Sequence, residues 1–395
     1  MCSRLRVVLT VQWLVCALSL AVNTPDAGAA GPAPLIPRET LFGSVEKTLA
    51  RLSPDGRKLA YLATDAHGVL QIQVRTVGSS DDVAVTQEPH RSLRWFTWAE
   101  DSKTILFTHD ALGDENTHLF SIDLATGNTR DLTPWAGIRA SLLRTDARHP
   151  DEVLITLNLR DRTQTDVWRV NLKTGATELD TQNPGDVAEW RVDATFTVRA
   201  AIAILPDGST DVRLRESNRA PFKSWVTAGP EENLTFIDFT NDGRSAFLAT
   251  SISTDMQRIV EKGLKTGTER LLSQNPASDP VAFFVSEQKH VINAVAFEVA
   301  GRQEWTTLEY GVKGDFEALK KTLTGDFRVE SADRAETTWV VSVVNDRAPT
   351  AWYLWDRKGR RLTPLFTERP RLEGQSLAAM TPLTVTARDS PLSSK

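Results

Sequence analysis

The fold is decided by residues 93–132, which read LRWFTWAEDSKTILFTHDALGDENTHLFSIDLATGNTRDL. Short apolar runs alternate here with polar turns that contain Asp, Ser, Asn and Gly. This pattern predicts four strands, over residues 93–99, 104–110, 119–124 and 129–132. Four short strands joined by tight turns form one antiparallel sheet, which is the unit that β-propeller blades repeat.

The last turn of this unit, Leu124-Ala125-Thr126-Gly127, recurs along the chain. Six further turns of this kind are centred on Gly78, Gly175, Asn218, Gly267, Gly314 and Gly359. Successive turns lie 43 to 49 residues apart. A constant period in this range is typical of four-stranded propeller blades. The sequence therefore predicts an all-β fold, a seven-bladed β-propeller of four-stranded antiparallel blades.

A second marker lies earlier in the repeat. It is Ser53-Pro54-Asp55-Gly56 near the start of the chain and Asn241-Asp242-Gly243 further on, each followed by an apolar run. Asp-Gly between apolar runs is a strong hairpin signal, because both residues tolerate positive φ. A β-sandwich with repetitive turns is the alternative, and the constant period argues against it. Helix is expected only over residues 315–323, as a turn of helix between strands.

Composition and charge narrow the function. The 395 residues are 41% hydrophobic and 25% charged, which is a globular composition. The formal net charge is −5, so nucleic acid is a poor candidate for a partner.

The N-terminus has the features of a secretory signal. Arg4 and Arg6 precede an apolar stretch over residues 7–22, and Ala27-Gly28-Ala29 fits a cleavage site. A membrane anchor is the alternative, but the stretch is short for one. We therefore expect a signal peptide over residues 1–29, a secreted or periplasmic protein, and no membrane span after cleavage.

Cleavage would also remove Cys2 and Cys16, which are the only cysteines. The mature chain would then have no thiolate nucleophile and no cysteine-ligated metal. After the signal we expect a linker over residues 30–45, the propeller over 46–370 and a stub over 371–395.

Several stretches resemble one peptidase family. They are residues 35–43 (LIPRETLFG), 51–56 (RLSPDG), 113–120 (GDENTHLF), 183–187 (NPGDV) and 369–374 (RPRLEG). Together they resemble the secreted S9 peptidases, the prolyl oligopeptidase family, in its dipeptidyl-aminopeptidase and acylaminoacyl-peptidase branch. The resemblance covers residues 35–389. It implies a propeller followed by an α/β-hydrolase domain that carries the catalytic Ser, Asp and His.

Residues 383–389 (LTVTARD) look like the first strand of that hydrolase, where the family would continue for several hundred residues. We therefore expect this chain to lack the catalytic domain. The residues support this independently, because the nearest match to a G-x-S-x-G nucleophile elbow is Gly374-Gln375-Ser376-Leu377-Ala378, and no histidine follows His290. No Walker loop, G-x-G-x-x-G or H-E-x-x-H motif is present either. We expect no catalytic residue, no cofactor and no metal site.

One polar cluster is a candidate substrate site. Asp114, Glu115 and Asn116 follow Asp110 between the second and third strands of the second blade, and His118 adjoins them. In the resembling enzymes, acidic groups on propeller hairpins can hold a substrate's amino terminus. Paired carboxylates bind an ammonium well in a cavity of low dielectric. A solvated acidic turn is the alternative.

Two functions follow. The first is the non-catalytic propeller portion of an S9-like serine peptidase, which in the full-length family controls peptide access to the hydrolase active site. Its partners would be short peptides, or a hydrolase domain or partner protein. The alternative is a stand-alone periplasmic propeller, similar to TolB, that binds proteins or peptides. The hydrolase-like segment over residues 383–389 favours the first.

Overall fold

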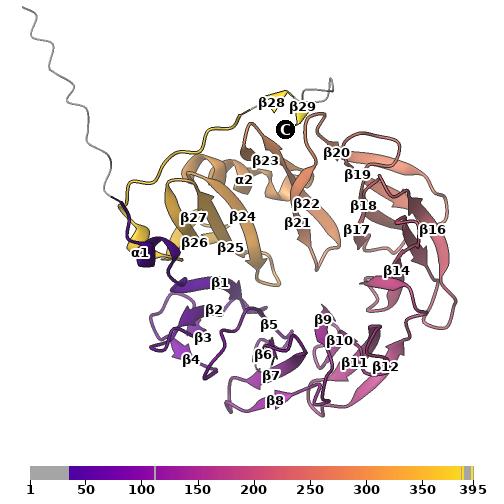
Figure 1. Ribbon diagram of the computed structural model, residues 1–395, viewed down its shortest axis with the longest axis horizontal. Helices are drawn as coiled ribbons and strands as arrows, with labels where there is room; N and C mark the ends of the chain where they lie inside the picture. The colour runs from indigo at the N-terminus through magenta and orange to yellow at the C-terminus, as the bar shows by residue number, and fades with distance from the viewer. Residues whose placement is uncertain (1–34, 111–112, 384, 387–392, 395) are drawn as a thin grey trace, which may run out of the picture.

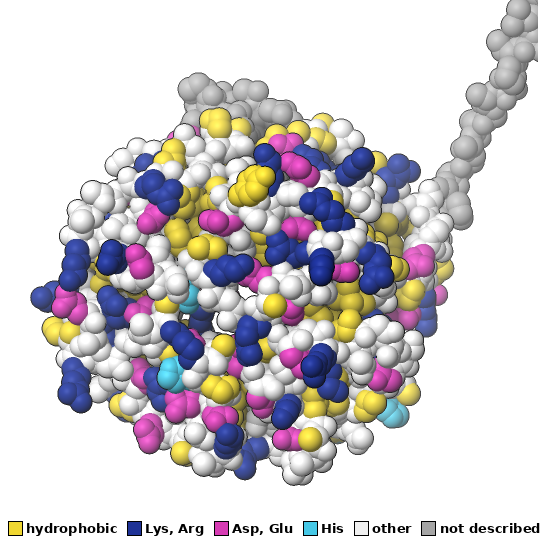
Figure 2. Space-filling model, turned by 180° about the vertical axis from the view of Figure 1, so that it is seen from behind, with side chains coloured by type: hydrophobic (Ala, Val, Ile, Leu, Met, Phe, Trp, Pro, Cys, Tyr) yellow, Lys and Arg dark blue, Asp and Glu magenta, His cyan; other side chains and the backbone are white. Residues whose placement is uncertain are grey.

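Seven small antiparallel sheets are arranged in a ring in the computed structural model (Figure 1). The space-filling view shows a narrow opening near the middle of the ring, the mouth of what we call the channel (Figure 2). The structure describes residues 35–110, 113–383, 385–386 and 393–394. The predicted signal peptide lies outside these residues. Each sheet is a meander of strands that pair in chain order, with its first strand next to the channel. The predicted seven-bladed β-propeller is confirmed.

Blades one to four follow each other without interruption. Their strands are β1 (Lys47–Leu52), β2 (Lys58–Thr64), β3 (Leu70–Thr76) and β4 (Val83–Ala84); β5 (Phe96–Trp98), β6 (Thr104–Asp110), β7 (Thr117–Asp123) and β8 (Thr129–Asp131); β9 (Ala140–Thr145), β10 (Glu152–Leu157), β11 (Asp166–Asn171) and β12 (Thr177–Thr181); β13 (Val187–Val192), β14 (Val198–Ile204), β15 (Thr210–Leu214) and β16 (Lys223–Ala228). The four strands predicted for blade two are all present, with β6 at the predicted bounds.

Blades five to seven complete the ring. Their strands are β17 (Leu234–Phe239), β18 (Ser245–Thr250), β19 (Arg258–Gly263) and β20 (Glu269–Gln274); β21 (Pro280–Ser286), β22 (Val291–Val299) and β23 (Arg302–Thr307); β24 (Asp326–Ala332), β25 (Thr338–Asn345), β26 (Ala348–Asp356) and β27 (Arg361–Thr367). A short helix α1 (Arg38–Phe42) precedes the ring, and a 3-10 helix η1 (Pro370–Leu372) and the pair β28 (Val385–Thr386) and β29 (Ser393–Ser394) follow it.

The sixth blade departs from the prediction. It has three strands, and helix α2 (Tyr310–Thr322) follows its third strand where the other blades have a fourth. Gly314 therefore lies within a helix and not in a strand turn, so its place in the repeat was a coincidence of spacing. The helix is longer than the expected single turn because Val312, Phe316 and Leu319 form a buried stripe at helical spacing. That stripe packs in the core of blades six and seven.

The turns between the first and second strands share one backbone device. In five blades the residue that donates its N–H to the carbonyl three residues earlier in the turn, over 2.8 to 3.2 Å, has a positive φ. It is Gly56 and Gly243 in the two turns that the sequence marked, and Ser102, Phe196 and Glu336 in three others. Because every blade starts at the same end of the channel, these turns gather on one face of the ring, which we call the turn face.

The ring closes without a shared sheet. Blade one is built only from the start of the described chain and blade seven only from the end of the propeller. We call their contact the seam. Buried Leu59 and Tyr61 of β2 pack there in one cluster with Val340, Trp352 and Leu354 of blade seven.

Hydrogen bonds flank this cluster. Glu368 accepts from the Thr48 hydroxyl (2.6 Å) and from Trp352 Nε1 (3.1 Å). The Leu52 N–H donates to Ser331 Oγ (3.1 Å). The ring is thus held shut by side-chain packing and a few bonds, and not by a strand from one end completing the other end's sheet.

Replacing Trp352 with alanine tests the seam. The side chain is 5% exposed and packs against Phe366 at 6.0 Å between ring centroids, so its loss leaves a cavity. We expect Trp352→Ala to lower the free energy of unfolding by about 3–5 kcal/mol in urea titrations. Leu179→Ala is the control, because Leu179 is 45% exposed on the outer strand β12, and its effect should stay near 0.5 kcal/mol. Equal small losses would contradict the packing account.

Candidate ligand site in the channel

The predicted acidic cluster lies at the hairpin between β6 and β7. Asp114 and Glu115 are exposed, and Asn116 is half-buried. The backbone and side-chain N–H groups of Asn116 donate to the two carboxylate oxygens of Asp114, at 3.1 and 3.0 Å. The side-chain hydrogen bond has the larger effect and the backbone bond the next; both lower the pKa of the Asp114 carboxyl below its usual range. The carboxylate is therefore charged and stabilises its own turn.

The side chain of His118 makes its polar contact with a residue outside this group. It lies on β7, and its Nδ1 is 2.8 Å from Asp131 Oδ2 on the neighbouring strand β8. Its ring also stacks near Phe120. The structure thus brings Asp114, Glu115 and Asn116 together and engages His118 elsewhere on the blade. Substrate binding by these four residues stays a prediction.

Charge is mixed over the face of the ring that Figure 2 shows. Basic and acidic side chains alternate there, and a narrow opening lies near the middle. Two adjacent cavities lie at the turn-face end of the channel, and they share Thr145, Glu287 and Gln288 as lining residues.

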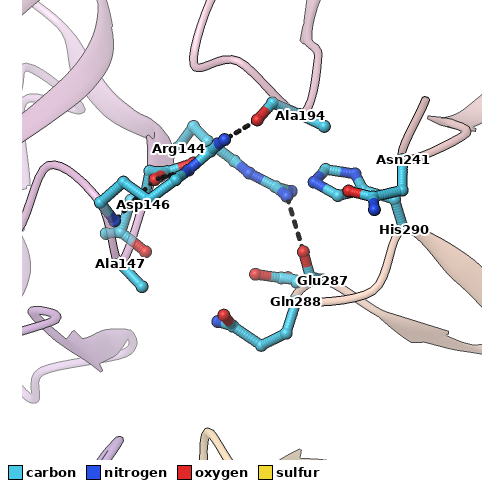
Figure 3. A pocket seen from close by; sticks show the side chains of 10 residues that line it. Arg144, Asp146, Ala147, Ala194, Asn241, Glu287, Gln288 and His290 are labelled. Atoms are coloured by element: carbon cyan, nitrogen blue, oxygen red, sulfur yellow. Dashed lines mark hydrogen bonds and ion pairs between the residues drawn. The ribbon is translucent and has the colours of Figure 1, made fainter. Parts of the chain in front are cut away.

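The smaller cavity, about 220 Å³, is enclosed by turns of blades three to six (Figure 3). The Arg144 guanidinium donates to the carbonyl oxygen of Glu287 at 3.3 Å and faces the ring of His290. His290 is 5% exposed, and its Nδ1 lies 2.9 Å from Asp238 Oδ2. His290 lies in a turn and is nevertheless buried, and Asp238 of blade five gives its ring a polar partner.

Arg148 closes the other side of this cavity. Its guanidinium donates to both carboxylate oxygens of Asp146, at 3.0 and 2.6 Å, and also to the carbonyl oxygen of Ala194 in the next blade. Burial alone would raise the pKa of Asp146, but the hydrogen bonds from Arg148 outweigh it and hold that pKa below its usual value. The pair is thus compensated internally.

The larger cavity, about 390 Å³, lies on the seam side of the channel. Blades one, two, three, six and seven all contribute to its lining. Its apolar wall includes Trp98, Phe283 and Val329. The volume lies within the range of about 300–1,000 Å³ that is typical of small-ligand sites.

Most charged groups that line this cavity already have partners. Arg334 lies 2.7 Å from a carboxylate oxygen of Glu100. Glu336 accepts from both Ser286 and Lys289. Asp333 accepts from the backbone N–H groups of its own turn. These groups build the turn face and leave few charges free.

Apart from Asp333, whose carboxylate is held by its own turn, three charged side chains of the cavity have no ionic partner within 4 Å among the described residues: Arg51 on β1, Glu330 on β24 and Glu287 in the turn after β21. Arg51 is the most confined. Its Nε is buried and has no hydrogen-bond partner in the described part of the chain. Burial lowers the pKa of its guanidinium, and the attraction of Glu330 and Glu287 opposes this without cancelling it.

Within the part of the chain that the structure describes, the Glu330 carboxylate accepts one hydrogen bond, from Ser342 Oγ to its Oε1 at 2.5 Å. Free charges of both signs beside an apolar wall can hold a small ligand. Among the described residues that line this cavity, none is a histidine. Among the described residues, no group of three His, Cys, Asp or Glu side chains is placed to hold a metal ion.

Sequence reasoning did not identify these three residues. Arg51 immediately precedes Leu52 and the Ser53–Gly56 marker, so its position at the end of an inner strand was readable. Its lack of a partner was not, because that depends on blades distant in sequence. Glu287 and Glu330 carry no local motif. A charged residue at the end of each predicted inner strand is the signal that could have found them.

Comparisons with known proteins place the chain beside peptidases. No family model matches it. It is 30% identical over 363 residues to dipeptidyl aminopeptidase BIII of Pseudoxanthomonas mexicana, covering 90% of this chain and 52% of that protein. It is 23% identical over 378 residues to dipeptidyl peptidase family member 6 of Caenorhabditis elegans, covering 90% and 50%. The chain thus spans about half the length of these relatives.

Solved structures show the same fold. A puromycin-hydrolyzing peptidase of Mycobacterium tuberculosis superimposes with a TM-score of 0.60 and 14% identity, covering 85% of this chain and 55% of that one. A puromycin hydrolase gives a TM-score of 0.57 and 14% identity, covering 90% and 59%. At such identities the likeness concerns the fold alone.

The unpaired state of Arg51 predicts an unusual stability effect. A confined cation without a partner costs folding free energy, so an apolar residue of similar length should relieve that cost. We expect Arg51→Met to be at least as stable as the wild type, with a gain on the order of 1 kcal/mol in urea unfolding.

Arg357→Met is the matched control. Arg357 donates to Asp315 at 3.0 Å, and that carboxylate is buried. Its loss should cost about 3–5 kcal/mol, because a buried charge is left without its partner. Comparable destabilisation by both substitutions would show that Arg51 is compensated in the fold and would refute its description as an unpaired charge.

Proposed function

Because the chain is homologous to the propeller half of an S9-family dipeptidyl aminopeptidase, we propose that it is the non-catalytic propeller portion of an S9-like serine peptidase. In this role it admits short peptides to a hydrolase active site and excludes folded proteins. The observation that carries the proposal is the alignment, which covers 90% of this chain but only 52% of the relative. The chain itself would not hydrolyse peptides, and it would work in the periplasm or outside the cell.

The closed ring supports the proposal that the propeller controls the access of peptides to a hydrolase active site. Its central channel is lined by seven inner strands that packed sheets hold in place. The larger cavity within it has the volume of a small-ligand site and not of a folded domain. A chain in extended conformation could enter such a channel, and a globular substrate could not.

Exposed apolar side chains support the docking of another domain. Leu35 is 96% exposed and Phe42, at the end of α1, is 74% exposed. In the segment after η1, Met380 and Leu383 are 82% and 83% exposed. This segment lies against blade seven, where the Met380 N–H donates to Asp346 at 2.7 Å. Exposed apolar groups near both ends of the propeller are typical of an interaction surface.

The predicted acidic hairpin has a role in this proposal. Asp114 and Glu115 are exposed carboxylates, so they are free to attract the amino terminus of a peptide. A stand-alone binding propeller remains the second reading, and the same experiment separates the two.

A fusion experiment tests the proposal. The chain alone should show no turnover of a fluorogenic dipeptidyl substrate above that of a buffer blank. Fused to the hydrolase domain of the Pseudoxanthomonas mexicana relative, the chain should give measurable turnover of dipeptidyl substrates. The fusion should not cleave folded proteins of about the size of casein. The isolated hydrolase domain is the control and should cleave with less size selectivity.

Two outcomes would contradict the proposal. Turnover of the substrate by the chain alone, with no hydrolase domain present, would show that the chain is an enzyme in its own right. A fusion that folds but gives the same size selectivity as the isolated hydrolase domain would show that the propeller does not control access, and would favour the stand-alone binder.

A further inference from the structure

The larger channel cavity is lined by three charged side chains that form no ion pair within the described part of the chain. Arg51, Glu330 and Glu287 line one space, come from three different blades and have no ionic partner within 4 Å among the residues described. Other carboxylates of the lining serve structural contacts, as Glu100 and Glu336 do. Charged side chains that have no ion-pair partner in a confined space can still attract the opposite charges of a ligand.

The arrangement specifies the charges of that ligand. The guanidinium of Arg51 has five N–H donors and matches a carboxylate, which it can bind through two parallel hydrogen bonds. Its buried Nε is a donor without an acceptor, which costs free energy until an acceptor arrives. The Glu330 carboxylate has only the Ser342 hydroxyl on one oxygen, so it can still accept from an ammonium group.

Arg51 and Glu330 attract each other and yet form no ion pair within 4 Å. A molecule with a carboxylate at one end and an ammonium a few ångströms away would bridge this gap and satisfy both. Exposed Glu287 on the neighbouring blade six adds to the attraction for the ammonium. A ligand with one charge alone would leave the other group of the pair desolvated and unpaired, which carries a cost.

The cavity walls specify the rest of the ligand. Trp98 is buried, Phe283 is half-buried, and Val285 and Val329 extend the apolar surface. Such a wall favours an apolar or aromatic side chain between the charged ends. The volume of about 390 Å³ has room for two residues and little more.

We propose that this cavity is a binding site for short zwitterionic peptides of dipeptide size, with the terminal carboxylate on Arg51 and the amino terminus on Glu330. The site is separate from the hairpin of Asp114 and Glu115, because it is built from the channel-facing ends of β1, β21 and β24. It takes its ligand class from the proposed peptide-handling function, but its test needs no hydrolase domain.

Calorimetric titration of the full chain with the dipeptide Ala-Phe tests the site. Ala-Phe should bind the wild type, while N-acetyl-Ala-Phe and Ala-Phe-amide should each bind about tenfold to a hundredfold more weakly, because each lacks one charge. These three ligands on the unmodified protein make the test independent of any variant's folding. Equal binding of all three, or no binding of Ala-Phe, would overturn the proposal.

Two variants assign each end of the ligand. Arg51→Met should remove the preference for Ala-Phe over the amide, lowering the affinity for Ala-Phe and not weakening binding of the amide. Glu330→Gln, which retains an oxygen for Ser342, should do the same for the N-acetylated ligand. Arg244→Met is the control, because the Arg244 side chain is 86% exposed in the turn after β17. This variant should bind Ala-Phe with the affinity of the wild type.

The same titrations show whether Ala-Phe binds at the hairpin of Asp114 and Glu115 and not in the channel. If Asp114→Ala with Glu115→Ala abolishes Ala-Phe binding while Arg51→Met and Glu330→Gln do not, the peptide binds at the hairpin and the channel proposal is wrong. Failure of the fusion enzyme with intact Ala-Phe binding would instead reject the proposed function and leave this site standing.

Discussion

The contact between blade one and blade seven turns a row of seven sheets into a closed ring. No strand of the described residues is shared across this seam, so closure relies on packing of side chains such as Tyr61, Trp352 and Leu354, with a few hydrogen bonds around Glu368. Each large side chain buried there contributes about 1.5–3 kcal/mol, and each hydrogen bond about 0.5–1.5 kcal/mol. Packing therefore dominates the closure.

The channel site depends on the same contact. Arg51 lies on β1 and Glu330 on β24, so the seam runs between the two groups that we assign to the ends of a peptide. The Leu52 N–H bonds to Ser331 Oγ beside them and fixes how the two strands lie. A chain that opened at the seam would separate these charges. Binding across it would in turn stabilise the closed ring, since a ligand stabilises the state that binds it.

The repeat pattern predicted the fold because propeller turns are local. Gly127 and Gly175 donate back across their turns with positive φ, so glycine at a constant spacing records a blade. The pattern failed at Gly314, which lies in helix α2 because an apolar stripe at helical spacing is buried there. It also did not predict the turns in which Ser102 or Phe196 adopts a positive φ, because neither residue is a glycine. The position of Arg51 at the end of an inner strand could be predicted from the sequence, but its lack of a partner could not, because that is set by blades far away in the chain.

Native-state hydrogen exchange tests the central claim, that packing at one unshared seam closes the ring. Inner strands β1 and β24 border the seam, and β13 is an inner strand within the body of the ring. We predict that amides of β1 and β24 exchange together, through an opening of lower free energy than the global unfolding that exposes β13. Equal opening free energies for all three strands would contradict the account, because the seam would then be no weaker than any other joint between blades.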